Sequence, residues 1–284
     1  MANTGTLGEI IENEVYKLPE NNINDRITDW LNSQGYPLEM SVAEVLQKLN
    51  FNVRQSEYYI DEESTQHREI DIVASLQKEI GDKLIRISLI LECKVSKDKP
   101  WIIFTSSNTR LASPARIAQR AGSKIGTIIL RNLAHEKEIQ DLKLFSLPER
   151  PGYGLTQAFT SGNDVAYNSC ISVSKATRAI VKQADQIRND RYVNISFPIL
   201  VIDGRLFETY LNDSNEMSVN EVSQGILLWR NPIIGMPHTV INVITKDALE
   251  DYLTRIRMDI IKIFDYISEN PSLISREPQV TLRN

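Results

Sequence analysis

The segment LIRISLILECKV (84–95) decides the fold of this chain, because every second side chain in it is apolar. The apolar odd-numbered positions are Ile85, Ile87, Leu89, Leu91, Cys93 and Val95. Side chains alternate between the two faces of a strand, so this pattern predicts a strand with one face in the core. The opposite face carries Glu92 and Lys94, and charges beside a buried strand are costly unless they are paired or functional.

A second strand is predicted at REIDIVASL (68–76), where Asp71 lies on the less apolar face. Gly81-Asp82 is a turn signal between the two strands, so we expect them to form an antiparallel hairpin. In that hairpin Asp71 can share a face with Glu92. Two carboxylates held together repel one another, and a divalent cation between them removes the repulsion. Because oxygen ligands favour Mg²⁺ or Mn²⁺, the pattern indicates a site for one of these metals.

Helices are predicted before and after these strands. The segment SVAEVLQKLN (41–50) has apolar side chains at helical spacing, and Ser41 and Glu44 have the spacing of a capping box. Residues 248–267 form a strongly amphipathic pattern, for which Thr245 is the expected N-cap. A further helix is expected at 164–188.

The remaining segments predict shorter elements and complete a single domain over residues 1–284. They are a helical or irregular lead-in within 1–37, strands at 51–59, 101–104, 126–133 and 197–211, and a short helix at 114–121. Asp203-Gly204 is a turn signal that divides the strand region 197–211 in two. The α/β core then covers 41–95, followed by an insertion at about 100–160.

The order of these motifs resembles the core of the PD-(D/E)XK nuclease superfamily. The similarity rests on a helix carrying Glu44, followed by EIDIVA (69–74) and LILECKV (89–95). It covers roughly residues 41–95 and is closest to Holliday-junction resolvases and Mrr-like restriction endonucleases. Ile70 stands where the family has the proline of its name. The resemblance implies a restriction-endonuclease-like fold, a mixed central sheet flanked by helices with a large insertion after the E-x-K strand.

The same resemblance assigns roles to individual residues. Asp71, Glu92 and the backbone carbonyl of Cys93 would be the ligands of Mg²⁺ or Mn²⁺. Lys94 would orient the attacking water and steady developing negative charge, while Glu44 would support the metal through a water molecule. The implied reaction is hydrolysis of a phosphodiester bond.

Basic side chains become frequent after the E-x-K motif. Residues 1–93 carry 8 Lys/Arg and 17 Asp/Glu, whereas residues 94–131 carry 8 Lys/Arg and 1 Asp/Glu. This asymmetry indicates a face that meets an anionic partner, and solvated basic loops explain it equally well. The residues expected to contact backbone phosphates are Arg110, Arg116, Arg120, Lys124, Lys175, Arg178 and Lys182. The last three lie three and four apart on one predicted helix, where a plain solvated face is the alternative.

The overall composition is that of a soluble globular protein with a formal net charge of −5. The chain has two cysteines, Cys93 and Cys170, and three histidines, which argues against a disulfide framework and a structural zinc site. Its apolar runs fall short of the ~20 residues that a transmembrane helix needs. The first residues lack a secretory pattern. We therefore expect a cytoplasmic protein with no membrane partner.

Together these features predict a Mg²⁺-dependent endonuclease that acts on DNA, with restriction or host defence as the setting that the resemblance suggests. A structure-selective repair or recombination nuclease is one alternative. A non-catalytic nucleic-acid-binding module of the same fold is another. A surface hairpin in which Asp71, Glu92 and Lys94 form only a salt bridge is the plainest alternative. A homodimer and a protein partner both fit the sequence, although it reveals no interface.

Overall fold

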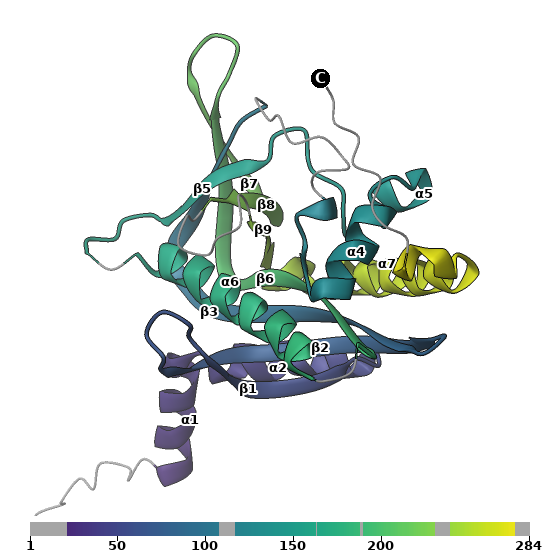
Figure 1. Ribbon diagram of the computed structural model, residues 1–284. Coiled ribbons are helices and arrows are strands. Elements are labelled where there is room, and N and C mark those ends of the chain that lie inside the picture. Colours follow the sequence, from purple (N-terminus) through teal and green to yellow (C-terminus); the bar gives the residue numbers. More distant parts are fainter. Residues whose placement is uncertain (1–21, 108–116, 163, 188–189, 231–238, 276–284) are drawn as a thin grey trace, which may run out of the picture.

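The protein is built around one large mixed β-sheet with helices on both faces (Figure 1). The computed structural model describes residues 22–107, 117–162, 164–187, 190–230 and 239–275. Helix α6 (Val165–Gln186) packs on one face of the sheet. Helices α2 (Tyr36–Lys48), α4 (Lys124–Leu133) and α7 (Leu249–Glu269) pack on the other. The predicted α/β class, with a mixed central sheet flanked by helices, is therefore confirmed.

The first three strands form an antiparallel meander. They are β1 (Asn52–Ile60), β2 (His67–Ile80) and β3 (Lys83–Thr105). Pairing between β2 and β3 continues up to a two-residue turn at Gly81-Asp82. Gly81 has a φ of +62°, a left-handed conformation that glycine adopts without steric cost. The predicted hairpin and its turn are therefore confirmed.

β6 (Tyr192–Leu211) lies beside β3 and runs parallel to it over almost the whole length of both strands. Parallel neighbours require a crossover connection, and α6 provides it by packing across the two strands. In the far half of the sheet, β3, β5, β8, β9 and β6 pair in turn and close a ring. The remaining strands are β4 (Ala121–Gly122), β5 (Gly152–Gln157), β7 (Met217–Val222), β8 (Gln224–Trp229) and β9 (Thr239–Thr245).

The turn predicted at Asp203-Gly204 is wrong, because β6 runs through these residues without interruption. Gly204 pairs with Ser96 of β3, next to a shift in the register of the two strands. A Cβ atom on Gly204 would lie 2.4 Å from the carbonyl oxygen of Ser96, which is too close for any side chain. The glycine therefore allows the two backbones to approach closely and does not mark a turn.

The strand predicted at 126–133 is also wrong, because these residues lie in α4. Ser123 caps this helix by accepting a hydrogen bond from the backbone N–H of Gly126. Ile129, Leu130 and Leu133 are buried at helical spacing. A short apolar run fits either a strand or a buried helix, so the apolar pattern alone does not separate the two.

The strands predicted at 51–59 and 101–104 are confirmed as β1 and the end of β3, and the helices at 164–188 and 248–267 as α6 and α7. Thr245 precedes a short 3₁₀ helix, and its hydroxyl donates to the Ser223 carbonyl, so its predicted role as the α7 N-cap is wrong. The helix expected at 114–121 and the lead-in within 1–37 fall partly outside the described residues. The remaining helices are α1 (Ile23–Gln34), α5 (Lys137–Gln140), η2 (Lys246–Ala248) and η3 (Pro271–Ile274).

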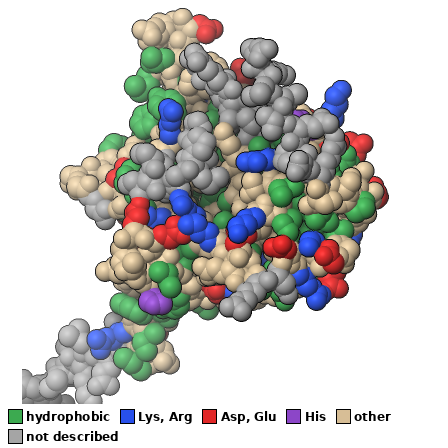
Figure 2. Space-filling model, in the orientation of Figure 1, with side chains coloured by type: hydrophobic (Ala, Val, Ile, Leu, Met, Phe, Trp, Pro, Cys, Tyr) green, Lys and Arg blue, Asp and Glu red, His purple; other side chains and the backbone are tan. Residues whose placement is uncertain are grey.

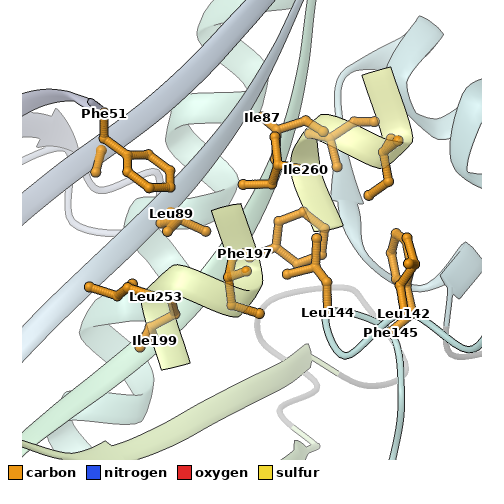
Figure 3. Packing of buried hydrophobic residues seen from close by; sticks show 14 of the residues in the cluster. Phe51, Ile87, Leu89, Leu142, Leu144, Phe145, Phe197, Ile199, Leu253 and Ile260 are labelled. Carbon is orange, nitrogen blue, oxygen red and sulfur yellow. The ribbon is translucent and has the colours of Figure 1, made fainter. Parts of the chain in front are cut away.

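The larger hydrophobic core lies between the sheet and α2, α4 and α7. Figure 3 shows its centre, where Ile87 and Leu89 of β3 meet Leu253 and Ile260 of α7 in one cluster with Phe197 of β6. Burying each such side chain contributes about 1.5–3 kcal/mol. The apolar odd positions of β3 thus hold one face of the strand in the core, and Glu92 and Lys94 emerge on the other. Within the described residues, no helix is both long and apolar enough to cross a membrane.

Candidate active site

Asp71, Glu92 and Lys94 lie together where β2 and β3 stop pairing. The regular ladder between the two strands ends at Ile72 and Leu91, immediately beside the two acidic residues. The backbone N–H of Cys93 donates to Asp71 Oδ2 at 2.6 Å, so a carboxylate takes the place of the missing strand partner. This bond fixes Asp71 against the E-x-K segment.

Three oxygen atoms converge on the ammonium group of Lys94. Its Nζ lies 2.7 Å from Glu92 Oε1, 3.1 Å from the carbonyl oxygen of Cys93 and 3.8 Å from Asp71 Oδ2. The second oxygen of Glu92 accepts a hydrogen bond of 2.9 Å from the hydroxyl of Ser172 on α6. Both carboxylate oxygens of Glu92 therefore have a partner, although the residue is only 7% exposed.

Burial and mutual repulsion shift the ionisation of these groups. Burial raises the pKa of Glu92, and the nearby charge of Asp71 raises it further, while Lys94 opposes both effects. Burial likewise raises the pKa of Asp71 against the opposing charge of Lys94. For Lys94, burial would lower the pKa, but the two carboxylates outweigh it and the pKa is raised. Lys94 therefore stays charged and holds the two carboxylates together.

The helix glutamate near this cluster is Glu39, and the prediction of Glu44 is wrong. The Glu44 side chain is 64% exposed and pairs with Lys48 at 2.7 Å. Burial raises the pKa of Glu39 to about 7, and the charge of Asp71 raises it as well. Five residues separate the two glutamates, which turns them about 140° apart around the helix axis.

The error about Glu44 came from the start of the helix. α2 begins at Tyr36, so Ser41 lies inside it and donates to the Leu38 carbonyl instead of capping. Gly35, with a φ of +88°, ends α1, and Pro37 follows in the first turn of α2, where proline is favoured. That signal was present in the sequence and would have placed Glu39 in the first turn.

A cleft of about 630 Å³ opens beside Glu92 and Lys94. Its walls come from the ends of β1 and β2 and from one face of α6. Ser172 stands at their junction, because its hydroxyl holds Glu92 and its carbonyl oxygen accepts a 3.5 Å hydrogen bond from Tyr59. Ser172 and Tyr59 were missed from the sequence, since only the packing of α6 against the sheet brings them to the site.

Arg120 is a core residue, so its prediction as a nucleic-acid contact is wrong. It is 3% exposed, and its guanidinium donates to the carbonyls of Val240 and Leu144. The group also lies over the ring of Phe197, 5.6 Å from its centre. The Arg120 guanidinium therefore contacts the loop at Leu144, strand β9 at Val240 and the core at Phe197.

The remaining phosphate contacts predicted in the segment 94–131 are Lys124, Arg110 and Arg116. Lys124 begins α4, where its backbone N–H donates to Asp185 near the end of α6. Asp185 lies 13 residues beyond Ser172, about 20 Å along the helix, so the structure does not bring Lys124 to the cleft. Arg110 and Arg116 lie outside the described residues. In the described part of the chain, the basic segment 94–131 does not form a single face.

Of the three predicted basic residues of α6, Lys175, one turn after Ser172, lies at the cleft. Arg178 and Lys182 continue the row along the helix. Each of the three makes an ion pair with the acidic loop between β1 and β2.

The cluster has the donor atoms of a site for a hard divalent cation. No group of three or more His, Cys, Asp or Glu side chains within the described residues is arranged to hold a metal ion. Asp71, Glu92 and the Cys93 carbonyl provide two carboxylates and one neutral oxygen, and Mg²⁺ commonly takes one or two carboxylates and completes its shell with water. These oxygens already converge on a cation, the Lys94 ammonium, so the residues fit such an ion.

Comparison with known proteins leaves the family unassigned. No family model, curated protein or solved structure matches this chain.

Proposed function

We propose that this chain is a metal-dependent nuclease that hydrolyses phosphodiester bonds of DNA. The observation that carries the proposal is the convergence of Glu92 Oε1, the Cys93 carbonyl and Asp71 Oδ2 on Lys94 Nζ. These are the groups that the resemblance to PD-(D/E)XK nucleases names as metal ligands and as the catalytic lysine. A surface salt bridge alone does not account for the burial of Glu92 or for the raised pKa of Glu39.

The fold supports the same proposal. The order α2, β1, β2, β3, α6 and β6 gives a mixed sheet flanked by helices, in which β3 carries the E-x-K motif. This order supports the restriction-endonuclease-like fold that the resemblance implies. Restriction or host defence in the cytoplasm is the setting that we propose by analogy.

Each residue of the cluster has a role in the proposed reaction. A bound Mg²⁺ or Mn²⁺ would activate water and offset the charge that develops on the phosphate. Asp71 is held in place by the Cys93 N–H and Glu92 by Ser172, so both carboxylates are oriented before substrate binds. Lys94 has a flexible stem, which lets its ammonium leave the ligand oxygens and face the scissile phosphate. Lys175, which lines the cleft, would contact the neighbouring backbone phosphate.

Cleavage assays test the proposal. Plasmid, linear, branched and single-stranded DNA would be incubated with Mg²⁺, Mn²⁺ or EDTA, using wild type, Asp71→Asn and Lys94→Ala. Lys48→Ala is the matched control, because it removes a lysine from an exposed ion pair away from the cluster. We expect metal-dependent cutting that both site variants lose and the control keeps.

The same assays separate the alternatives. A preference for branched over linear DNA would favour a repair or recombination nuclease. Binding without cutting under every metal would favour a non-catalytic module. Cutting that survives in Asp71→Asn and Lys94→Ala would refute this assignment of the site.

A further inference from the structure

An acidic loop covers the basic row of α6. Asp61, Glu62 and Glu63 follow β1, and each pairs with a cation of the helix. Lys175 Nζ lies 3.0 Å from Asp61 Oδ2 and 2.7 Å from Glu63 Oε2. Arg178 Nε lies 3.2 Å from Glu62 Oε2, and Lys182 forms a hydrogen bond with the other oxygen of the same carboxylate. Three carboxylates thus match three cations.

The ion pairs of Asp61 and those of Glu62 differ in strength. Asp61 is 2% exposed, and its carboxylate also accepts hydrogen bonds from Arg68 and from the backbone N–H of Glu63. The Glu62 side chain is 44% exposed, as is that of its partner Lys182. Exposed ion pairs contribute only about 0–1 kcal/mol each and weaken with salt. Asp61 therefore anchors the loop, while the contacts of Glu62 are readily exchanged.

The loop lies on the approach to the candidate active site. Asp61 and Lys175 line the same cleft as Glu92 and Lys94. In Figure 2, acidic and basic side chains alternate across the middle of this face, over the position of α6 in Figure 1. A DNA backbone that reaches Lys94 along α6 would pass over the cations that Glu62 now occupies.

We propose that Glu62 holds the place of a substrate phosphate, so that the loop shields the basic row until a nucleic-acid backbone displaces it. The inference rests on the proposed function, because it treats the cleft as the nucleic-acid site. Phosphate oxygens bind arginine and lysine in the same way as carboxylate oxygens do, so one anion can replace the other. The loop also lowers non-specific binding, since the row presents no net positive charge while the loop is in place.

Glu62→Gln tests this inference through binding in EDTA, where cleavage plays no part. Anisotropy of a fluorescein-labelled 20-base-pair duplex would be measured over a range of NaCl concentrations. Asp247→Asn is the matched control, because it removes the same charge from an exposed position in η2, just before α7. We expect Glu62→Gln to bind about 10-fold more tightly than the control. The slope of log affinity against log salt should steepen by about 1, since the carboxylate of Glu62 then no longer offsets one of the cations that meet the phosphates.

A triple variant tests whether the tighter binding depends on the basic row of α6. Adding Arg178→Gln and Lys182→Gln to Glu62→Gln should return affinity to the wild-type level, while the melting temperature confirms that each variant is folded. Equal affinity of Glu62→Gln and Asp247→Asn, or no binding by Glu62→Gln at all, would overturn the inference. Tighter binding by a protein that never cuts DNA would uphold the shielding role and refute the nuclease.

Discussion

Lys94 keeps the carboxylates of the buried Glu92 and the half-buried Asp71 close together by placing its ammonium near both of them and the Cys93 carbonyl. A lysine in this position acts as a counter-ion when metal is absent. In the proposed metal-bound state it would leave these oxygens to the divalent cation. Its long side chain makes that movement inexpensive, so the residue can serve both states.

Glu39 and Glu44 lie on the same helix, α2, so that one can be tested as the site residue and the other as its control. Glu39→Gln should slow metal-dependent DNA cleavage by about 10- to 100-fold, because residues that orient metal ligands from outside typically have effects of this size. Glu44→Gln should leave the rate unchanged, since Glu44 pairs with Lys48 in solvent. Initial rates of plasmid cleavage measure both. Equal rates for the two variants would remove Glu39 from the site.

At the scale of single residues, the sequence predicted part of the candidate active site. Glu92 and Lys94 followed from the two-residue period of a strand, and Asp71 from the hairpin. Glu39 was missed because the helix start was placed too late. Ser172 lies 80 residues from Glu92 in the chain, and no local pattern links the two.

At the scale of secondary-structure elements, the loop that carries Asp61 joins the β1–β2 hairpin to α6. Burial would raise the pKa of Asp61, but hydrogen bonds from Lys175 and the Glu63 N–H outweigh it and lower the pKa to about 2. The carboxylate therefore stabilises the folded state only while it is ionised.

Asp61→Asn should lower the free energy of unfolding by about 1–3 kcal/mol near neutral pH. Because the folded pKa lies below the unfolded value of 3.8, this stabilisation is present above about pH 4 and is lost as the pH falls through about 2. Urea unfolding of wild type and variant between pH 7 and pH 2 measures the difference. A difference that does not shrink in acid would show that the charge of Asp61 contributes nothing.

Arg120 links elements that are distant in the sequence. Arg120→Met should lower the free energy of unfolding by about 2–3 kcal/mol, because the buried Val240 and Leu144 carbonyls lose their donor. Affinity for DNA should stay within about twofold of wild type, in contrast to changes in the α6 row. Urea unfolding and fluorescence anisotropy measure the two effects. A large loss of affinity in a stable variant would restore Arg120 as a contact.

Helices and strands were predicted correctly where the sequence pattern was long. They were predicted wrongly where contacts with distant segments determine the conformation. The amphipathic helix at 248–267 was identified from its own sequence and is α7. The segment 126–133 is helical because one face packs into the core, and Gly204 lies within β6 because β3 crosses closely beside it. Both depend on neighbours that a local pattern does not contain.

At the scale of the whole molecule, charge is arranged so that the site is shielded. The chain carries a formal net charge of −5, and its acidic loop neutralises the basic row nearest the cleft. The mixed sheet was predicted from the sequence, whereas the parallel pairing of β3 with β6 was not, since it depends on a crossover of almost 90 residues. That pairing is what places α6, with Ser172 and the basic row, against the E-x-K strand.

The central claim is that Asp71, Glu92 and the Cys93 carbonyl hold one divalent cation. Titration of Mn²⁺ into the metal-free protein, followed by the electron paramagnetic resonance signal of free Mn²⁺, tests it without any assay of activity. We predict one site per chain, weakened at least about 10-fold by Asp71→Asn and unchanged by Glu44→Gln. No binding by wild type, or equal affinity in Asp71→Asn, would contradict the claim.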